Sequence, residues 1–428
     1  MFKYLFLLLF FTTLYGSPMK NRYTLHSYLD LLIKEDIGYK NKTLESKVLV
    51  LTSLLEQSRY NPDIFLDANA RHEKLLDVLR GDNVQSSISG NINFNMHLYD
   101  AQKEVYQKRR KALFDTLSEL KVLDAKEQLQ LLGIALYVNL YKMQQTIKAY
   151  NKLLFYQEKI TQIATDRSAK GLGGIYDRTQ AVNDLINIKL RLADLKERFI
   201  QTEYAFRQSI NLESGAAIVL QPLSFVDLPY SLQQLQHDAL AYNIGIKVKA
   251  KEFEVAQSDV SLSKQSDGLS VDFASRFGYG YRKEPVGIVG FDDTTNGDTW
   301  SLSLDLKYPL YAKNQTQILT QQSKIRALEA KNNIELQKKE LSRTVNRLYN
   351  AWEKYMIKNN LFKKQKSVLQ ERIDITYNRY KEALESYKPY SDALRDMALS
   401  NESYINNRLS ADQTVLDLYI LTGRTIVE

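Results

Sequence analysis

The chain contains 428 residues, with 58 Lys and Arg against 50 Asp and Glu and a formal net charge of +8. The positive charges are spread along amphipathic segments and form no basic block, which argues against nucleic-acid binding. Cysteine is absent, which excludes disulfides, thiolate metal sites and the acylated N-terminal cysteine of a lipoprotein.

Residues 1–17 have the pattern of a secretory signal peptide. Lys3 precedes an apolar stretch over residues 4–11, and a polar exit follows. The stretch is too short to span a bilayer as a helix, which needs about 20 residues, and the sequence has no other uninterrupted apolar run of that length. Any membrane insertion of the mature chain is therefore expected to use β-strands.

An internal repeat divides the rest of the chain. Leu98-Tyr99 recurs as Leu310-Tyr311, an offset of 212 residues (310 minus 98). The first copy, 18–215, is predicted to contain a helix, strands at about 63–72 and 86–98, a long helix over 100–170 and a return helix over 175–212. The second copy, 216–428, is predicted to contain a helix over 231–266, strands at about 269–282 and 299–309, a long helix over 311–388 and a return helix over 390–422.

The predicted strands alternate apolar and polar residues. Their length suits a bilayer crossing, which takes about 9 to 11 residues in a tilted strand, with apolar side chains outward and polar ones inward. An ordinary antiparallel sheet with one wet face shows the same alternation, so the strands alone leave both alternatives open. Four membrane strands cannot close a barrel, so several copies would have to share one.

The long helices favour the first alternative. Only 17 Gly and 7 Pro occur in the chain, and residues 312–388 contain neither, so one helix could extend for about 115 Å. Between Leu341 and Tyr380, apolar and aromatic residues recur at alternating steps of four and three, which indicates a coiled-coil seam.

One stretch of the second copy carries a specific motif. It begins with Arg379 and Tyr380, continues through Ala383 to Asp392, and has Gly423 downstream. The pattern resembles the signature of the TolC family of outer-membrane efflux proteins. The first copy shows a similar motif from Arg167 to Gly171, followed by Asp177, and the family-like Tyr308-Pro309-Leu310-Tyr311 closes the last strand.

The resemblance implies a mainly α fold with a small β part. Long α-helical coiled coils would form a barrel that crosses the periplasm, and four strands per chain would join a shared, trimeric twelve-stranded barrel in the cell outer membrane. The homotrimer would be the exit duct of a tripartite efflux or type I secretion system. Its partners would be a periplasmic adaptor protein and an inner-membrane pump, and it would use no cofactor.

The resemblance also implies a gate at the periplasmic tip. The helices would turn at Gly171, Gly173 and Gly174 in the first copy and near Pro389 in the second. The gate and tip residues would be Tyr380, Lys388, Pro389, Asp392 and Asp177. The chain departs from the family pattern at Ala383, where the family has Gly, and at Pro389, where it has Asp.

Simpler roles remain open for these residues. Asp177 and Asp392 could each stabilise the start of a helix, because carboxylates are favourable in N-terminal turns. Tyr380 continues the coiled-coil seam, so it could be a packing residue.

The sequence offers no catalytic or metal-binding pattern. Its four histidines, His26, His72, His97 and His237, are far apart, and no hydrolase or metalloprotease motif occurs. Three functions are weighed: a passive duct, which is favoured, a periplasmic coiled-coil scaffold without a pore, and an outer-membrane hydrolase. The hydrolase would need a clustered nucleophile and base that the sequence does not show, so the chain is not expected to be an enzyme.

Overall fold

The computed structural model describes residues 21–77, 81–171, 174–213, 218–223, 228–265, 267–285, 292–310 and 314–424. The predicted signal peptide and Gly173 lie outside these residues. The fold is mainly α with a small β part, which confirms the predicted fold class. No helix in the described ranges has both the length and the apolar character needed to cross a membrane.

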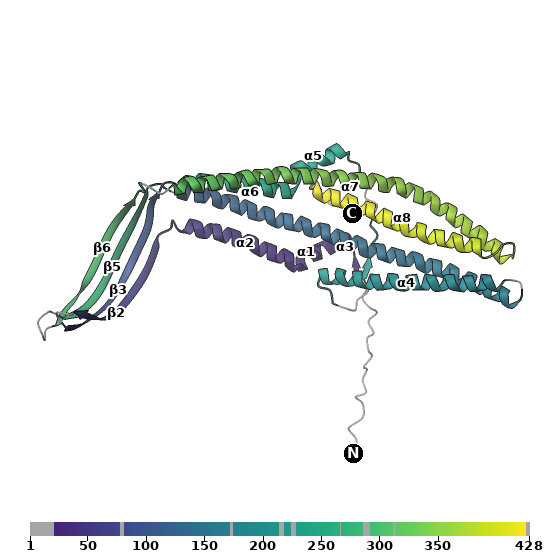
Figure 1. Ribbon diagram of the computed structural model, residues 1–428, viewed down its shortest axis with the longest axis horizontal. Helices are drawn as coiled ribbons and strands as arrows, with labels where there is room; N and C mark the ends of the chain where they lie inside the picture. The colour runs from purple at the N-terminus through teal and green to yellow at the C-terminus, as the bar shows by residue number, and fades with distance from the viewer. Residues whose placement is uncertain are drawn as a thin grey trace, which may run out of the picture. The chain divides into compact units, whose positions relative to one another are not determined.

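Eight helices and six strands make up the described chain (Figure 1). The helices are α1 (Leu25–Glu35), α2 (Ile37–Ser58), α3 (Lys103–Ala169), α4 (Ile175–Ser209), α5 (Leu232–Tyr242), α6 (Ile244–Ser263), α7 (Gln315–Lys381) and α8 (Lys388–Leu421). The strands are β1 (Asn21–Tyr23), β2 (Asp63–Asp77), β3 (Gly81–Asp100), β4 (Ile218–Leu220), β5 (Ser270–Pro285) and β6 (Asp292–Lys307).

Several predicted boundaries differ from those of the structure. The long helix expected over 311–388 ends at Lys381, because Ala383 adopts a left-handed conformation with φ 64° that closes the helix. The helix expected over 231–266 is divided into α5 and α6 at Asn243, whose backbone has ψ 128°. Each of the four long strands extends beyond its predicted limits at one end or both, since backbone pairing continues where the alternation of side chains stops. The exceptions are the start of β2, which matches the prediction, and the start of β5 and the end of β6, which fall one and two residues inside it.

The chain forms two compact units, and each contains segments of both predicted repeats. One unit comprises residues 1–41, 123–244 and 338–428, and the other comprises 42–122 and 245–337. Left-handed backbone positions recur at the offset of 212 found in the sequence. The pairs are Gln102 and Asn314, Gly171 and Ala383, and Asn211 and Gly423.

The second unit contains an antiparallel four-stranded sheet in the order β2-β3-β5-β6 (Figure 1). Its register places one apolar residue of each strand directly opposite the next, in the row Leu66, Ile92, Phe277 and Trp300. The strands β2 and β6 are the two edges, and neither has an outer partner within the described chain. An unpaired edge leaves a row of backbone donors and acceptors free to bind another strand.

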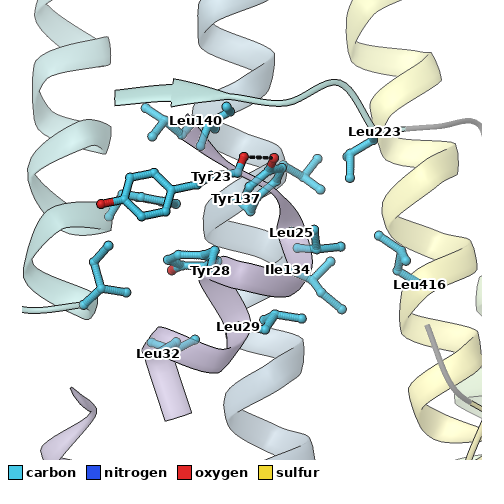
Figure 2. Packing of buried hydrophobic residues seen from close by; sticks show 14 of the residues in the cluster. Tyr23, Leu25, Tyr28, Leu29, Leu32, Ile134, Tyr137, Leu140, Leu223 and Leu416 are labelled. Atoms are coloured by element: carbon cyan, nitrogen blue, oxygen red, sulfur yellow. Dashed lines mark hydrogen bonds between the residues drawn. The ribbon is translucent and has the colours of Figure 1, made fainter. Parts of the chain in front are cut away.

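In the first unit, one hydrophobic cluster joins α1 to α3, α4 and α8 (Figure 2). Tyr28 stacks on Phe206 with 4.2 Å between the ring centroids. The Tyr137 hydroxyl donates to the Tyr23 carbonyl at 3.0 Å. A Cβ at Gly133 would lie 2.5 Å from Leu32 Cδ2, so the absence of a side chain at this point of α3 lets α1 approach.

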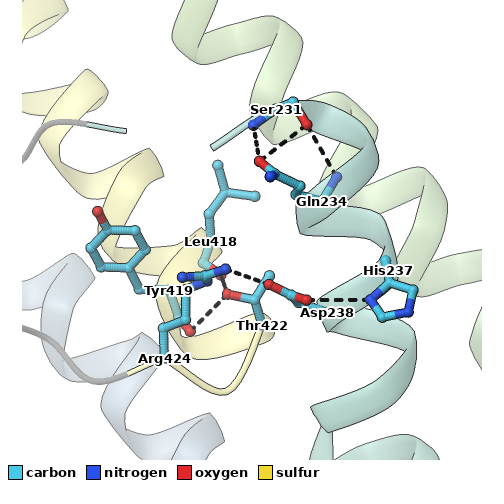
Figure 3. Close-up of polar contacts among 8 residues, drawn as sticks. All are labelled: Ser231, Gln234, His237, Asp238, Leu418, Tyr419, Thr422 and Arg424. Carbon is cyan, nitrogen blue, oxygen red and sulfur yellow. Dashed lines mark hydrogen bonds and ion pairs between the residues drawn. The ribbon is translucent and has the colours of Figure 1, made fainter. Parts of the chain in front are cut away.

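The end of α8 is attached to α5 by polar contacts (Figure 3). Arg424 forms an ion pair with Asp238, and its Cζ lies 3.5 Å from the centroid of the Tyr230 ring. The Thr422 hydroxyl donates to the Leu418 carbonyl at 2.7 Å and thereby satisfies one of the last carbonyls of the helix. Ser231 and Gln234 form a capping box that starts α5.

Candidate functional site

The residues singled out by the motif lie in or near two interhelical turns. The turn between α3 and α4 passes through Gly171, which has φ 69°, and Gly174, which is the N-cap of α4. The turn between α7 and α8 passes through Ala383, and Pro389 occupies the first turn of α8, where a missing N–H costs nothing. Sequence reasoning therefore located both turns, although it set the second one too late.

Tyr380 is fully buried beside the first of these turns. Arg167 donates through Nη1 to the Tyr380 carbonyl at 2.6 Å, and its Cζ lies 4.5 Å from the ring centroid. The Tyr380 hydroxyl has no hydrogen-bond partner among the described residues. Burial raises the pKa of this phenol, and the charge of Asp177 raises it further. The side chain therefore stays neutral and attaches the end of α7 to α3.

A buried network centred on Tyr387 joins three helices in the same region. Gln157 of α3 donates to the Tyr387 hydroxyl at 2.8 Å, and that hydroxyl donates to Asp184 of α4 at 2.8 Å. Ser391 of α8 also donates to Asp184, at 2.5 Å. Gln157 further donates to the Ala181 carbonyl at 2.8 Å. Burial raises the pKa of Tyr387, so it too stays neutral.

Sequence reasoning missed this network. Tyr387 lies within the motif stretch but is not one of its signature positions, and Gln157 and Asp184 belong to helices that the sequence could not place beside it. The available signal was aromatic enrichment: Tyr377, Tyr380, Tyr387 and Tyr390 occur within one short stretch. Tyr380 and Tyr387 form an edge-to-face pair with 5.8 Å between centroids, an arrangement that aromatic rings favour.

The two predicted acidic residues have ordinary surroundings. Asp392 pairs with Lys388 at 3.4 Å and with Arg395 at 2.9 Å, both on its own helix. Asp177 lies in the first turn of α4, where the helix dipole favours a carboxylate. Asp392 is beyond the first turn of α8, so helix-start stabilisation accounts for Asp177 and not for Asp392.

The sheet presents a second candidate site, with faces of opposite character. On one face, large apolar side chains are exposed to an unusual degree: Leu66 is 75% exposed, Trp300 72% and Leu302 65%. On the other face, Asp67 accepts hydrogen bonds from Asn91 and Asn93, and Arg276 donates to Asn93 at 2.9 Å.

His97 also belongs to the sheet, where its ring pairs with Asp272 of the neighbouring strand. The described residues contain no group of three or more His, Cys, Asp or Glu that could hold a metal ion. The sheet therefore has one exposed apolar face and, on its opposite side, a face of hydrogen-bonded polar side chains.

Comparison with known proteins places this geometry in context. Residues 235–424 match the family model described as outer membrane efflux protein. No curated protein sequence matches the chain.

Solved structures with the same fold cover nearly the whole chain. CusC is 12% identical with a TM-score of 0.80, and the match covers 94% of this chain and 92% of CusC. The CmeC outer membrane channel of Campylobacter jejuni is 13% identical with a TM-score of 0.79, over 93% and 85% of the two chains. The MtrE outer membrane channel of Neisseria gonorrhoeae, in its open state, is 15% identical with a TM-score of 0.71, over 94% and 89%.

Proposed function

We propose that this chain, which belongs to the outer membrane efflux protein family, is a passive exit duct for substrates leaving the cell. The family is one of channel proteins and not of enzymes. Substrates would pass along a water-filled path shared by several copies of the chain, and the energy would come from an inner-membrane pump. A periplasmic adaptor would connect the two.

The exposed apolar face of the sheet carries this proposal. Burying a large apolar side chain is worth about 1.5 to 3 kcal/mol, so a soluble sheet would gain by covering residues such as Trp300, which is 72% exposed. Lipid would cover them equally well. The opposite face, with Asp67, Asn91 and Arg276, would then line an aqueous lumen.

The sheet edges support assembly into a closed ring of copies. Successive strands run in opposite directions, so β6 of one copy and β2 of the next would also be antiparallel. A sheet in lipid must close into a barrel, because no water is present there to hydrogen-bond the backbone donors and acceptors of an unpaired edge. Three copies would give the twelve-stranded barrel that the family resemblance implies, with the sheet in the outer membrane and the helices in the periplasm.

The interhelical turns would form the inner end of the duct. Tyr380, Lys388, Pro389, Asp392 and Asp177 are proposed as gate and tip residues, with Gly171 and Gly174 in the turn itself. The buried Tyr387 network would hold α8 against α3 and α4 while the duct is closed. Because Asp392 is neutralised by two neighbouring cations, we propose a weaker affinity for cations than an unpaired acidic ring would have.

Cysteine accessibility tests the placement of the sheet, since the natural chain has no cysteine and each introduced thiol is unique. Leu302→Cys and Ser303→Cys are adjacent residues on opposite faces of β6. In intact outer-membrane preparations, a water-soluble maleimide should label Ser303→Cys quickly and Leu302→Cys only after detergent is added. Equal labelling of both, with the protein recovered in the soluble periplasmic fraction, would favour the scaffold function.

A further inference from the structure

A cavity of about 290 Å³ lies between α3, α7 and α8, away from the interhelical turns. Each helix contributes residues at helical spacing, such as Tyr141, Gln145, Lys148 and Lys152 on α3. The cavity lies where two hydrophobic clusters adjoin. Leu409 belongs to one of them, and Leu153 and Met397 belong to the other.

The floor and the walls of the cavity differ in character. Its floor is formed by buried apolar side chains that are at most 4% exposed: Leu153, Ile373, Met397 and Leu409. Its walls contain three half-buried tyrosines, Tyr141, Tyr156 and Tyr404. A cleft with an apolar floor and a few polar groups at its opening is the usual form of a small-molecule site.

The charged side chains that line the cavity are all positive. Lys148, Lys152, Lys366 and Arg408 all line the cavity, and none of its lining residues is acidic. No ion pair joins any of these four cations to a carboxylate among the described residues, although Arg408 is close enough to Asp412 for their charges to interact.

Two of these cations lie near aromatic rings in place of carboxylates. Lys152 Nζ is 5.9 Å from the centroid of the Tyr156 ring, and Lys366 Nζ is 5.8 Å from that of Tyr404. Both distances are at the outer limit of a cation–π contact, so the ammonium groups are only weakly held there. An anion entering the cavity could therefore recruit them at little cost.

We infer that this cavity is a binding site for small organic anions that carry an aromatic or aliphatic body. The apolar part would lie on Leu153 and Met397 between the tyrosine rings, and the carboxylate or sulfonate would lie at the opening beside Lys152 and Lys366. The volume suits a ligand of one or two rings. The site does not depend on the duct, since it is built entirely within one chain.

The test is calorimetric titration of the purified full-length protein with 2-naphthoate. Two matched ligands separate the parts of the site: 2-naphthamide has the same rings without the charge, and inorganic phosphate has charge without rings. We expect one 2-naphthoate per chain, with binding weakened at high salt because the attraction is electrostatic. Each matched ligand should bind at least tenfold more weakly.

The double variant Lys152→Gln and Lys366→Gln should weaken 2-naphthoate binding about tenfold, equivalent to about 1.4 kcal/mol. The control is Lys159→Gln, which removes a lysine from the same helix that lies 4.3 Å from the Phe155 ring but outside the cavity. It should leave the affinity unchanged. Absence of binding to the natural protein, equal binding of 2-naphthamide, or an unchanged affinity in the double variant would each overturn the inference.

Discussion

The repeat-related turn residues Gly171 and Ala383 allow a matched exchange. Both have left-handed backbone conformations, with φ 69° and 64°, yet only one is glycine. A non-glycine residue in the left-handed region is destabilised by about 1 to 2 kcal/mol. Glycine avoids this strain but loses about 0.5 to 1 kcal/mol more conformational entropy on folding than alanine does. Ala383→Gly should therefore stabilise its turn by about 0.5 to 1 kcal/mol, and Gly171→Ala should destabilise its turn by a similar amount.

Contacts do not complicate the comparison at Gly171, because a Cβ there would meet nothing within 4 Å. Hydrogen exchange measures the turns locally through the amides that close them. Gly171 N donates to the Ser168 carbonyl at 3.2 Å, and Leu384 N donates to the Arg379 carbonyl at 2.9 Å. We expect amide exchange at Leu384 to slow about two- to fivefold in Ala383→Gly. Amide exchange at position 171 should quicken by a similar factor in Gly171→Ala.

The control is Ala330→Gly in the interior of α7, which should lose about 1 kcal/mol because glycine is a poor helix former. The reasoning is refuted if Ala383→Gly loses protection as the control does. It is equally refuted if Gly171→Ala slows exchange.

Three further outcomes are expected. Asp412 is fully buried, neither of its carboxylate oxygens has a hydrogen-bond partner among the described residues, and desolvation raises its pKa to about 6 despite Arg408. Because the folded-state pKa exceeds the unfolded value of 3.8, stability should fall as pH rises from about 4 to 6. Chemical denaturation should show that the natural protein loses about 3 kcal/mol more unfolding free energy over this pH range than the Asp412→Asn variant does. Parallel pH profiles of the two proteins would contradict this. Leu304→Arg on the apolar face should prevent outer-membrane assembly, at about 2 to 4 kcal/mol, whereas Ser303→Arg on the other face should still fractionate with the membrane. Tyr387→Phe removes both hydrogen bonds of the hydroxyl and should quicken exchange of amides at the start of α8 at least fivefold, and unchanged exchange would exclude a holding role for that network.

Regular structure was largely predictable from the sequence because its signals are local. Alternation located the strands, and the scarcity of Gly and Pro indicated the long helices. The errors fall where tertiary contacts decide the outcome. Within residues 231–266, Asn243 and Gly245 are only weak local signals of a break. The Asn243 side chain is fixed at the break by donating to the Leu421 carbonyl at 3.3 Å, far away in the sequence. Likewise, Ala383 ends α7 although alanine favours helices.

The candidate site was predictable only in part. The motif singled out Tyr380 and Asp392 as gate residues, a role that stays a prediction, and their surroundings depend on which helices are neighbours. Tyr387 acquires its role from Gln157 and Asp184, which are separated from it by 230 and 203 positions. The partners of Asp392, Lys388 and Arg395, were within reach of sequence reasoning, since they lie four and three residues away on one helix.

Single-channel recording in planar lipid bilayers tests the central claim most directly. The purified full-length protein should insert and show discrete conductance steps, with brief openings in the natural chain and more frequent ones in Tyr387→Phe. A protein that inserts and never conducts, in the natural chain and in that variant alike, would contradict the existence of a water-filled path.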